Sequence, residues 1–153
     1  MKKIFKAGVM ASVIAICCIL SVGCTRNNGD IGVWFGAWKL ESMSNKGEIG
    51  NSPAIIWKFQ NHVVEMQEVW EGNHESVDHF GSWTQVDDHL ILDFGHSDNM
   101  FPAGSWKYTP PAVTEIPNGT TEMVIKELSN KRIELIYNRS DSEPIVYKLI
   151  RWS

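Results

Sequence analysis

The five histidines are the residues of this chain that most directly suggest metal or acid–base chemistry. Neutral imidazole is a common ligand of transition metals, but a structural zinc site needs several nitrogen or sulfur ligands grouped in one motif. The histidines are spread over separate turns, loops and one strand, and no cysteine pair accompanies them. We therefore expect no metal site, and each histidine is expected to contact solvent or make a single hydrogen bond. They are His62, His74, His79, His89 and His96.

Nucleophilic catalysis lacks a local motif in this sequence. There is no Gly-x-Ser-x-Gly turn to present a serine. All three cysteines, Cys17, Cys18 and Cys24, lie within the first 24 residues, outside the part of the chain that resembles a domain. The adjacent acids Asp87 and Asp88 separate two predicted strands, where aspartate is an ordinary turn residue. We expect no catalytic residue and no cofactor, and hence a protein that is not an enzyme.

Aromatic side chains are the stronger candidates for a binding site, because each ring offers a large apolar surface. Some alternate along predicted strands, so that they share one face. In a small barrel such rings either fill the interior or contact a ligand, and filling is the commoner role. The candidate ligand-binding residues on strands are Trp57, Phe59, Trp83, Phe94, Tyr137 and Tyr147.

A second aromatic group lies in the segment MFPAGSWKYTPP, residues 100–111. It contains Phe101, Trp106 and Tyr108 between glycine and proline residues, in the longest predicted link between strands. Long ordered loops often carry function. These three rings are therefore further candidate ligand contacts, and the alternative is a lid that packs over the domain and binds nothing.

The elements that must position these rings are β-strands. From residue 33 onward, apolar residues alternate with polar ones or form short β-branched and aromatic runs, broken by Gly, Asn, Asp and Pro. No segment shows a sustained helical stripe, although residues 32–38 can include a short 3₁₀ turn. The predicted strands span residues 33–42, 54–60, 62–70, 76–86, 89–94, 121–128, 132–137 and 144–152.

The links between the predicted strands alternate in length. Residues 60–61, 86–88 and 129–131 form tight turns, whereas residues 43–53, 71–75, 95–120 and 138–143 form longer loops. In an up-and-down meander, successive links lie at opposite ends of the sheet. We call the end with the three tight turns the floor, and the end with the four long loops the mouth. Eight such strands can abolish their edges by closing, which predicts an all-β, eight-stranded antiparallel up-and-down barrel.

The first and last predicted strands meet at the floor of such a barrel. Gly36 and Trp38 share one face of the first strand, and Arg151 lies on the corresponding face of the last. We expect the Arg151 guanidinium to cover the Trp38 indole. This Gly-x-Trp with a distal arginine resembles the pattern of lipocalins, and most closely that of lipocalin-like lipoproteins of Gram-negative bacteria. The resemblance covers all eight strands and implies a binding cup of unspecified content.

The N-terminus has the composition of a targeting segment. Three early lysines precede an apolar run over residues 7–20, as in a signal peptide spanning residues 1–23. The residues Ser21-Val22-Gly23-Cys24 resemble a bacterial lipobox, which implies fatty acylation of Cys24, for example with palmitate, and a place in the bacterial cell envelope, at the outer membrane. The alternative is ordinary cleavage that leaves a free thiol. Residues 24–31 then form a polar tether, and residues 32–153 the barrel domain.

Charge restricts the partners of the mature protein. Removing residues 1–23 takes away three lysines and no acid, so the formal charge falls from -4 to -7. Nucleic acid is therefore not expected as a partner, since it demands clustered cations. The leading hypothesis is a lipid-anchored protein that holds a small apolar or amphipathic ligand. The alternative is a filled, non-catalytic barrel that presents its mouth loops to a protein or glycan partner.

Overall fold

The structure, a computed structural model, describes residues 31–72, 75–96 and 106–153. The chain divides into two compact units, residues 1–32 and residues 33–153, and every strand lies in the second unit. The predicted signal peptide, Cys24 and Phe101 lie outside the described residues. Within the described ranges, no helix is both long enough and apolar enough to cross a membrane.

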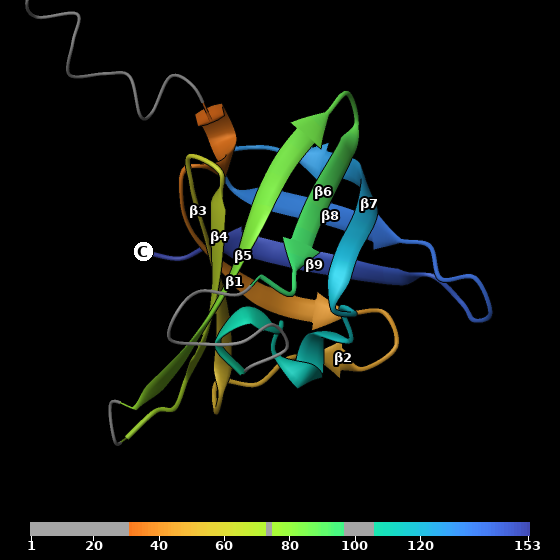
Figure 1. Ribbon diagram of the computed structural model, residues 1–153. Coiled ribbons are helices and arrows are strands. Elements are labelled where there is room, and N and C mark those ends of the chain that lie inside the picture. The colour runs from red at the N-terminus through yellow and green to blue at the C-terminus, as the bar shows by residue number, and fades with distance from the viewer. Residues whose placement is uncertain (1–30, 73–74, 97–105) are drawn as a thin grey trace, which may run out of the picture. The chain divides into compact units, whose positions relative to one another are not determined.

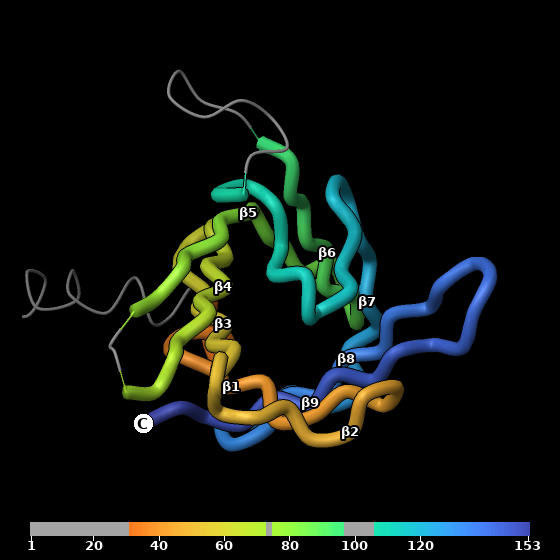
Figure 2. Tube along the Cα trace, turned by 90° about the horizontal axis from the view of Figure 1, so that it is seen from below, coloured from red at the N-terminus to blue at the C-terminus, as the bar shows by residue number. Residues whose placement is uncertain are grey.

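The second unit is a closed antiparallel barrel. Its strands follow the order β2-β1-β3-β4-β5-β6-β7-β8-β9, and β1 also pairs with β9, which closes the sheet. Figure 1 shows the strands crossing the domain, and Figure 2 shows them following one another around a ring. The strands are β1 (Gly36–Met43), β2 (Gly47–Glu48), β3 (Ala54–Gln60), β4 (Val63–Val69), β5 (Ser76–Val86), β6 (His89–Phe94), β7 (Gly119–Leu128), β8 (Arg132–Tyr137) and β9 (Ile145–Arg151).

This architecture confirms the eight-stranded barrel and adds a ninth, two-residue strand. β1 pairs with β3 only from Gly36 to Lys39. Its register with β9 shifts between Leu40 and Ser42, and beyond that bulge β1 pairs with β2. A bulge bends its strand and strengthens its twist, so the end of β1 leaves β3 and gains β2 as a neighbour.

Some strand ends differ from the sequence prediction. β1 begins at Gly36 because Gly32–Trp34 form the short 3₁₀ helix η2. β7 begins at Gly119, two residues early, because Gly119 pairs with Phe94 at the end of β6. Two further 3₁₀ helices, η3 (Trp106–Tyr108) and η4 (Ala112–Thr114), lie in the long link between β6 and β7.

The tight turns of the barrel lie at the floor, as the alternating link lengths predicted. Asn61 has a φ of 47° and Asp87 a φ of 52°, both in the left-handed region. Asparagine and aspartate tolerate this conformation better than most residues, so they suit two-residue turns between β3 and β4 and between β5 and β6.

Alternation along the strands separates the interior from the surface. In the sequence, Val63/Val64 and Phe80/Trp83 put apolar residues on both faces of their strands, so alternation alone leaves their orientation open. In the structure Val64 is fully buried whereas Val63 is 47% exposed, and Trp83 is buried whereas Phe80 lies on the outer face. The largest fully buried side chains are Trp38, Trp57, Tyr147, Phe59 and Phe94. The interior is therefore lined mainly by aromatic and aliphatic groups.

Candidate functional site

The floor of the barrel is closed by a stacked arginine and tryptophan. The Arg151 Cζ lies 4.2 Å from the centre of the Trp38 ring, and Arg151 Nη1 donates a hydrogen bond of 2.5 Å to the carbonyl oxygen of Phe35. Gly36 has a φ of 117°, and a Cβ there would lie 2.4 Å from that same Nη1. The backbone conformation favours glycine here, and any larger residue would also have to displace the guanidinium from its place over Trp38.

Trp34 is a floor residue that sequence analysis missed. It lies in η2, is 2% exposed, and donates from Nε1 to the Gln85 side-chain oxygen at 2.8 Å. Its carbonyl oxygen accepts a 3.1 Å hydrogen bond from Trp38 Nε1. Trp34 therefore links the start of the barrel to the far end of β5, and a hydrogen bond joins it to Trp38.

Above the floor, the candidate rings form one continuous cluster. The ring centres of Trp34 and Phe59 are 4.8 Å apart, and those of Phe59 and Trp83 are 5.1 Å apart. Trp57 continues the series, at 6.4 Å from Phe59 and 6.0 Å from Tyr147. These separations are typical of tilted and edge-to-face aromatic contacts. The structure thus brings together four of the predicted site residues, Trp57, Phe59, Trp83 and Tyr147.

The remaining strand candidates lie apart from this cluster. Phe94 is 1% exposed, and its ring fills the place that a side chain at Gly81 would take, since a Cβ there would lie 2.9 Å from the ring. Tyr137 is half-buried at the mouth end of β8. In the mouth link, Trp106 is 58% exposed and Tyr108 is half-buried.

Three buried polar atoms in the interior have no hydrogen-bond partner among the described residues: Trp57 Nε1, Trp83 Nε1 and Thr121 Oγ1. Trp83 and Thr121 both flank Leu92, on β5 and β7 respectively. A buried donor without an acceptor costs about 1–3 kcal/mol. These three atoms are unpaired, whereas other buried polar groups, such as Trp34 Nε1, His79 and the Tyr147 hydroxyl, have partners.

The mouth is closed by the segment of residues 110–116, which we call the plug. Pro110, Pro111, Thr114 and Ile116 are buried. The Tyr147 hydroxyl, inside the barrel, donates a 2.7 Å hydrogen bond to the Thr114 carbonyl oxygen. Burial raises the pKa of Tyr147 well above its ordinary value, so the hydroxyl remains a donor at physiological pH. Sequence analysis did not foresee the plug, because no periodic pattern marks it.

An ionic cluster around Glu115 ties the plug to the neighbouring loops. The Glu115 carboxylate lies 3.0 Å from Lys46 Nζ and 3.3 Å from Arg139 Nη1, and it accepts from Asn45 Nδ2 at 3.1 Å. Lys46 Nζ also donates to the Val113 carbonyl oxygen at 2.8 Å. The hydrogen bond from Lys46 is the main cause that lowers the pKa of Glu115, and it outweighs the opposing effect of burial.

Replacing Glu115 with glutamine is expected to cost less than about 1 kcal/mol of unfolding free energy at neutral pH, because the pair is partly exposed. The folded-state pKa of Glu115 is lowered, so this contribution is present above the ordinary carboxyl pKa and is lost as the pH falls through the lowered value. Urea denaturation of both proteins at neutral and at acidic pH measures it. A difference between the two proteins that grows on acidification would contradict this account.

His79 holds the other end of the mouth link, and here the expectation of a single hydrogen bond was wrong. Its Nδ1 lies 2.9 Å from the Trp106 carbonyl oxygen and 2.7 Å from that of Thr109, and its Nε2 lies 3.1 Å from Glu68 Oε2. All three partners are acceptor oxygens, so the imidazole lies between the mouth link and Glu68 on β4. The sequence showed that His79 could face inward, but not that a loop some 30 residues away would fold onto it.

Substituting His79 with glutamine is expected to lower the unfolding free energy by about 1–3 kcal/mol, because one amide cannot reach both the carbonyls and Glu68. His89→Gln is the matched control. The side chain of His89 is 36% exposed beside Asp88 and Glu122, and it should contribute little. Chemical denaturation compares the two variants. Equal losses of unfolding free energy would show that the contacts of His79 with the mouth link do not stabilise the fold.

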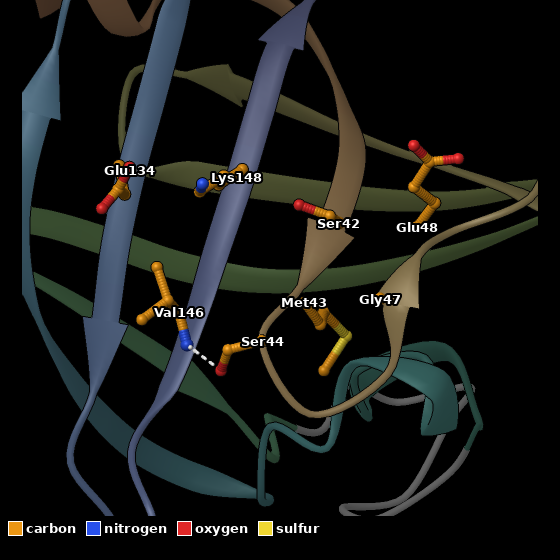
Figure 3. A pocket seen from close by; sticks show the side chains of 8 residues that line it. All are labelled: Ser42, Met43, Ser44, Gly47, Glu48, Glu134, Val146 and Lys148. Atoms are coloured by element: carbon orange, nitrogen blue, oxygen red, sulfur yellow. Dashed lines mark hydrogen bonds between the residues drawn. The ribbon is translucent and has the colours of Figure 1, made fainter.

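A shallow pocket of about 450 Å³ lies on the outer surface where β1 meets β9. Figure 3 shows it between β8, β9 and the β1–β2 turn, with the Ser44 hydroxyl oxygen bonded to the Val146 backbone N–H. Its side chains on β8 and β9 alternate with the inward Leu135 and Tyr147. It is therefore separate from the interior. Among the described residues, no three His, Cys, Asp or Glu side chains gather closely enough to hold a metal ion.

Comparison with known proteins identifies the fold. No family model matches this sequence, and no curated protein matches it. Two crystal structures resemble it, each with a TM-score of 0.55. A lipocalin-like protein from Bacteroides uniformis is 13% identical, and the match covers 79% of this chain and 100% of that one. An uncharacterized protein from Bacteroides eggerthii is 16% identical, with 78% and 99% covered. The chain thus has a lipocalin-like fold.

Proposed function

We propose that this protein is a lipid-anchored binding protein that holds one small apolar or amphipathic molecule in its barrel, beneath the mouth loops. The observation that carries the proposal is the set of three unpartnered polar atoms inside an apolar, aromatic interior. A ligand oxygen that accepts a hydrogen bond from one of these indole N–H groups would remove the cost of leaving that donor unpaired. Eight-stranded barrels of the lipocalin-like type have the capacity for one such ligand.

Ligand binding in this proposal requires the plug and the interior rings to move. Each of the three polar atoms is fully covered by neighbouring groups. A ligand therefore reaches them only when the plug moves aside and the rings change rotamer. The plug is held by polar contacts at Glu115 and through the Tyr147 hydroxyl, and by the burial of Pro110, Pro111 and Ile116, so opening it requires all of these contacts to break together.

The charges of the interior restrict the ligand. His79 is already paired with Glu68, and the Arg151 guanidinium is already bound to the carbonyl oxygens of Phe35 and Asn130. An uncompensated carboxylate would be costly in this interior. The proposed ligand is therefore neutral inside the barrel, with an oxygen acceptor such as a carbonyl, and carries any charge at the mouth.

The anchor in this proposal is acylated Cys24, which the lipobox-like sequence supports. The outer membrane of the bacterial cell envelope is the proposed location. The polar residues 24–31 then connect the anchor to the barrel.

A second function is favoured by the plug itself. Thr114 is fully buried and Ile116 is 6% exposed, so the mouth is closed by the protein's own chain. A filled barrel of this kind would present its mouth loops to a protein or glycan partner, without a ligand and without catalysis.

Titration with N-phenyl-1-naphthylamine, an apolar dye that fluoresces in dry surroundings, tests the proposed function. We expect saturable binding of one dye per barrel. Leu92→Trp enlarges the side chain between Trp83 and Thr121, so it should fill the space that the dye needs and abolish binding. The larger side chain overpacks the interior and should lower the unfolding free energy by about 1–3 kcal/mol. Thr84→Trp, on the outer face of β5, is the matched control. If the folded Leu92→Trp protein binds as the wild type does, the dye does not occupy the interior.

The mouth aromatics should affect binding more than stability. Trp106 is exposed, and its contact with His79 runs through its carbonyl oxygen, which alanine retains. Replacing both Trp106 and Tyr108 with alanine is therefore expected to leave the melting temperature nearly unchanged. Retention of a bound molecule should weaken, by roughly tenfold for each 1.4 kcal/mol of lost contact. Unfolding of the double variant would instead place both rings in the core.

A further inference from the structure

The large apolar side chains that remain exposed are distributed unequally between the two ends of the barrel. Among the described residues, one lies at the mouth, Trp106, and four lie at the floor. The exposed fractions are 40% for Phe35, 47% for Val63, 52% for Val86 and 47% for Trp152. We call these four residues the floor arc.

The floor arc occupies consecutive strand ends. The Trp152 backbone N–H donates to the Ala37 carbonyl oxygen at 2.9 Å, which places Trp152 beside the start of β1. Phe35 forms a bridge with Phe59 on β3, and Val63 begins the next strand. Val86 ends β5, the neighbour of β4. The arc thus runs over the ends of β9, β1, β3, β4 and β5.

The other side of the floor is polar. Its turn, between β7 and β8, consists of Ser129, Asn130 and Lys131, and the Arg132 side chain that follows is exposed. The exposed large apolar residues are therefore confined to one side of the floor, where they alternate with the exposed turn residues Asn61, His62, Asp87 and Asp88. That side includes η2, where the chain enters the barrel.

The proposed anchor is close in the sequence to this side. Cys24 precedes Ile31, the first described residue, by seven positions. Even a fully extended segment of that length reaches only roughly 25 Å. A short tether of this kind keeps the start of β1, and hence the floor, near the bilayer that holds the acyl chains.

We propose that the floor arc docks on the surface of that bilayer. The inference rests on the acylated Cys24 of the proposed function. Tryptophan and phenylalanine favour the depth of the lipid headgroups, where an apolar ring meets polar surroundings. The Lys39 Nζ lies 5.5 Å from the centre of the Trp152 ring and donates a hydrogen bond to the Asn51 side-chain oxygen, so this cation borders the floor arc but is already held by the protein.

Docking by the floor has a consequence for the binding site. Floor and mouth are opposite ends of one barrel, so the mouth loops would face away from the bilayer. A ligand would then enter the barrel from the aqueous side, and not directly from the lipid phase.

Site-specific fluorescence quenching tests this orientation. Ser153→Cys places a label beside the floor arc, and Ser142→Cys places one in the exposed β8–β9 loop at the mouth. Acylation occupies Cys24, so each mature variant has a single free thiol. The full-length variants are expressed, purified with their acyl chains, labelled with a nitrobenzoxadiazole dye, and reconstituted in phosphatidylethanolamine and phosphatidylcholine vesicles that contain a lipid with a shallow nitroxide.

We expect the nitroxide to quench the label at residue 153 strongly and the label at residue 142 weakly, with iodide in solution giving the reverse order. Replacing Phe35 and Trp152 together with serine should reduce the ratio of docked to undocked protein roughly tenfold, given the apolar area removed. Trp106→Ser, which removes a more exposed indole at the mouth, should leave that ratio unchanged.

Two negative results are distinguishable. Equal quenching at both positions, in a protein that mass spectrometry shows to be acylated, overturns docking and leaves the anchor intact. Labelling of two thiols in each variant shows that Cys24 is free, which overturns the anchor of the proposed function and the docking inference with it.

Discussion

Replacing Trp38 with alanine is expected to destabilise the barrel by about 3–5 kcal/mol, the cost of truncating a large buried aromatic. The indole is fully buried, donates to the Trp34 carbonyl oxygen and lies under the Arg151 guanidinium. Its loss leaves a cavity at the floor and frees both partners. Chemical denaturation followed by circular dichroism measures the change, and Trp152→Ala, at a half-exposed tryptophan, is the control with a small expected effect.

Arg151 should contribute to the same stabilisation of the floor as Trp38. Arg151→Ala is expected to cost less than Trp38→Ala, because the guanidinium lies at the edge of the floor and binds two backbone carbonyls there. Residues in contact are not independent, so the double variant should lose less than the sum of the single losses. Strict additivity would show that the stack seen in the structure does not stabilise the floor.

The second large effect concerns the anchor. Cys24→Ser is expected to move the protein from the membrane fraction to the soluble fraction, because each buried acyl methylene contributes about 0.8 kcal/mol to membrane binding. Cys18→Ser is the matched control, since that residue is expected to be removed with the signal peptide. Metabolic labelling with a clickable fatty acid and detergent partitioning give the readout. A wild-type protein that takes up no label would show that Cys24 is not acylated.

The sequence predicted the barrel because strand alternation and link length are local properties. The bounds of β3, β5, β6 and β8 agree with the predicted ranges residue for residue. The contact between Trp38 and Arg151 was also predictable, because closing an eight-stranded meander brings the first strand beside the last, and parity then decides which side chains face inward.

The features that escaped prediction depend on contacts without a local pattern. β2 has only two residues, and it exists because β1 bulges after Leu40. Trp34 was included in the predicted first strand but lies in the 3₁₀ helix η2, whose course strand alternation does not describe. The plug and the three partners of His79 join segments far apart in the chain, through turns whose course the sequence does not specify.

The candidate site, too, could be predicted only in part from local sequence patterns. Parity placed Trp57 and Phe59 on one face and put Tyr147 on the face of Arg151, but it left the orientation of Trp83 open, because Phe80 and Trp83 put apolar residues on both faces of their strand. The structure places all four rings inside the barrel. Whether such rings only fill the interior or also contact a ligand depends on small differences in packing. The unpartnered Nε1 atoms of Trp57 and Trp83 and the hydroxyl of Thr121 became visible only when the neighbours of each atom were known.

Native mass spectrometry of the protein, isolated from its own host in mild detergent, tests the central claim most directly. A binding protein is predicted to appear at the mass of the mature acylated chain plus one small molecule, which collisional activation releases and which the Leu92→Trp variant does not carry. A spectrum that contains only the ligand-free acylated chain, alone or in a stable complex with another macromolecule, would contradict ligand binding and support the filled barrel instead.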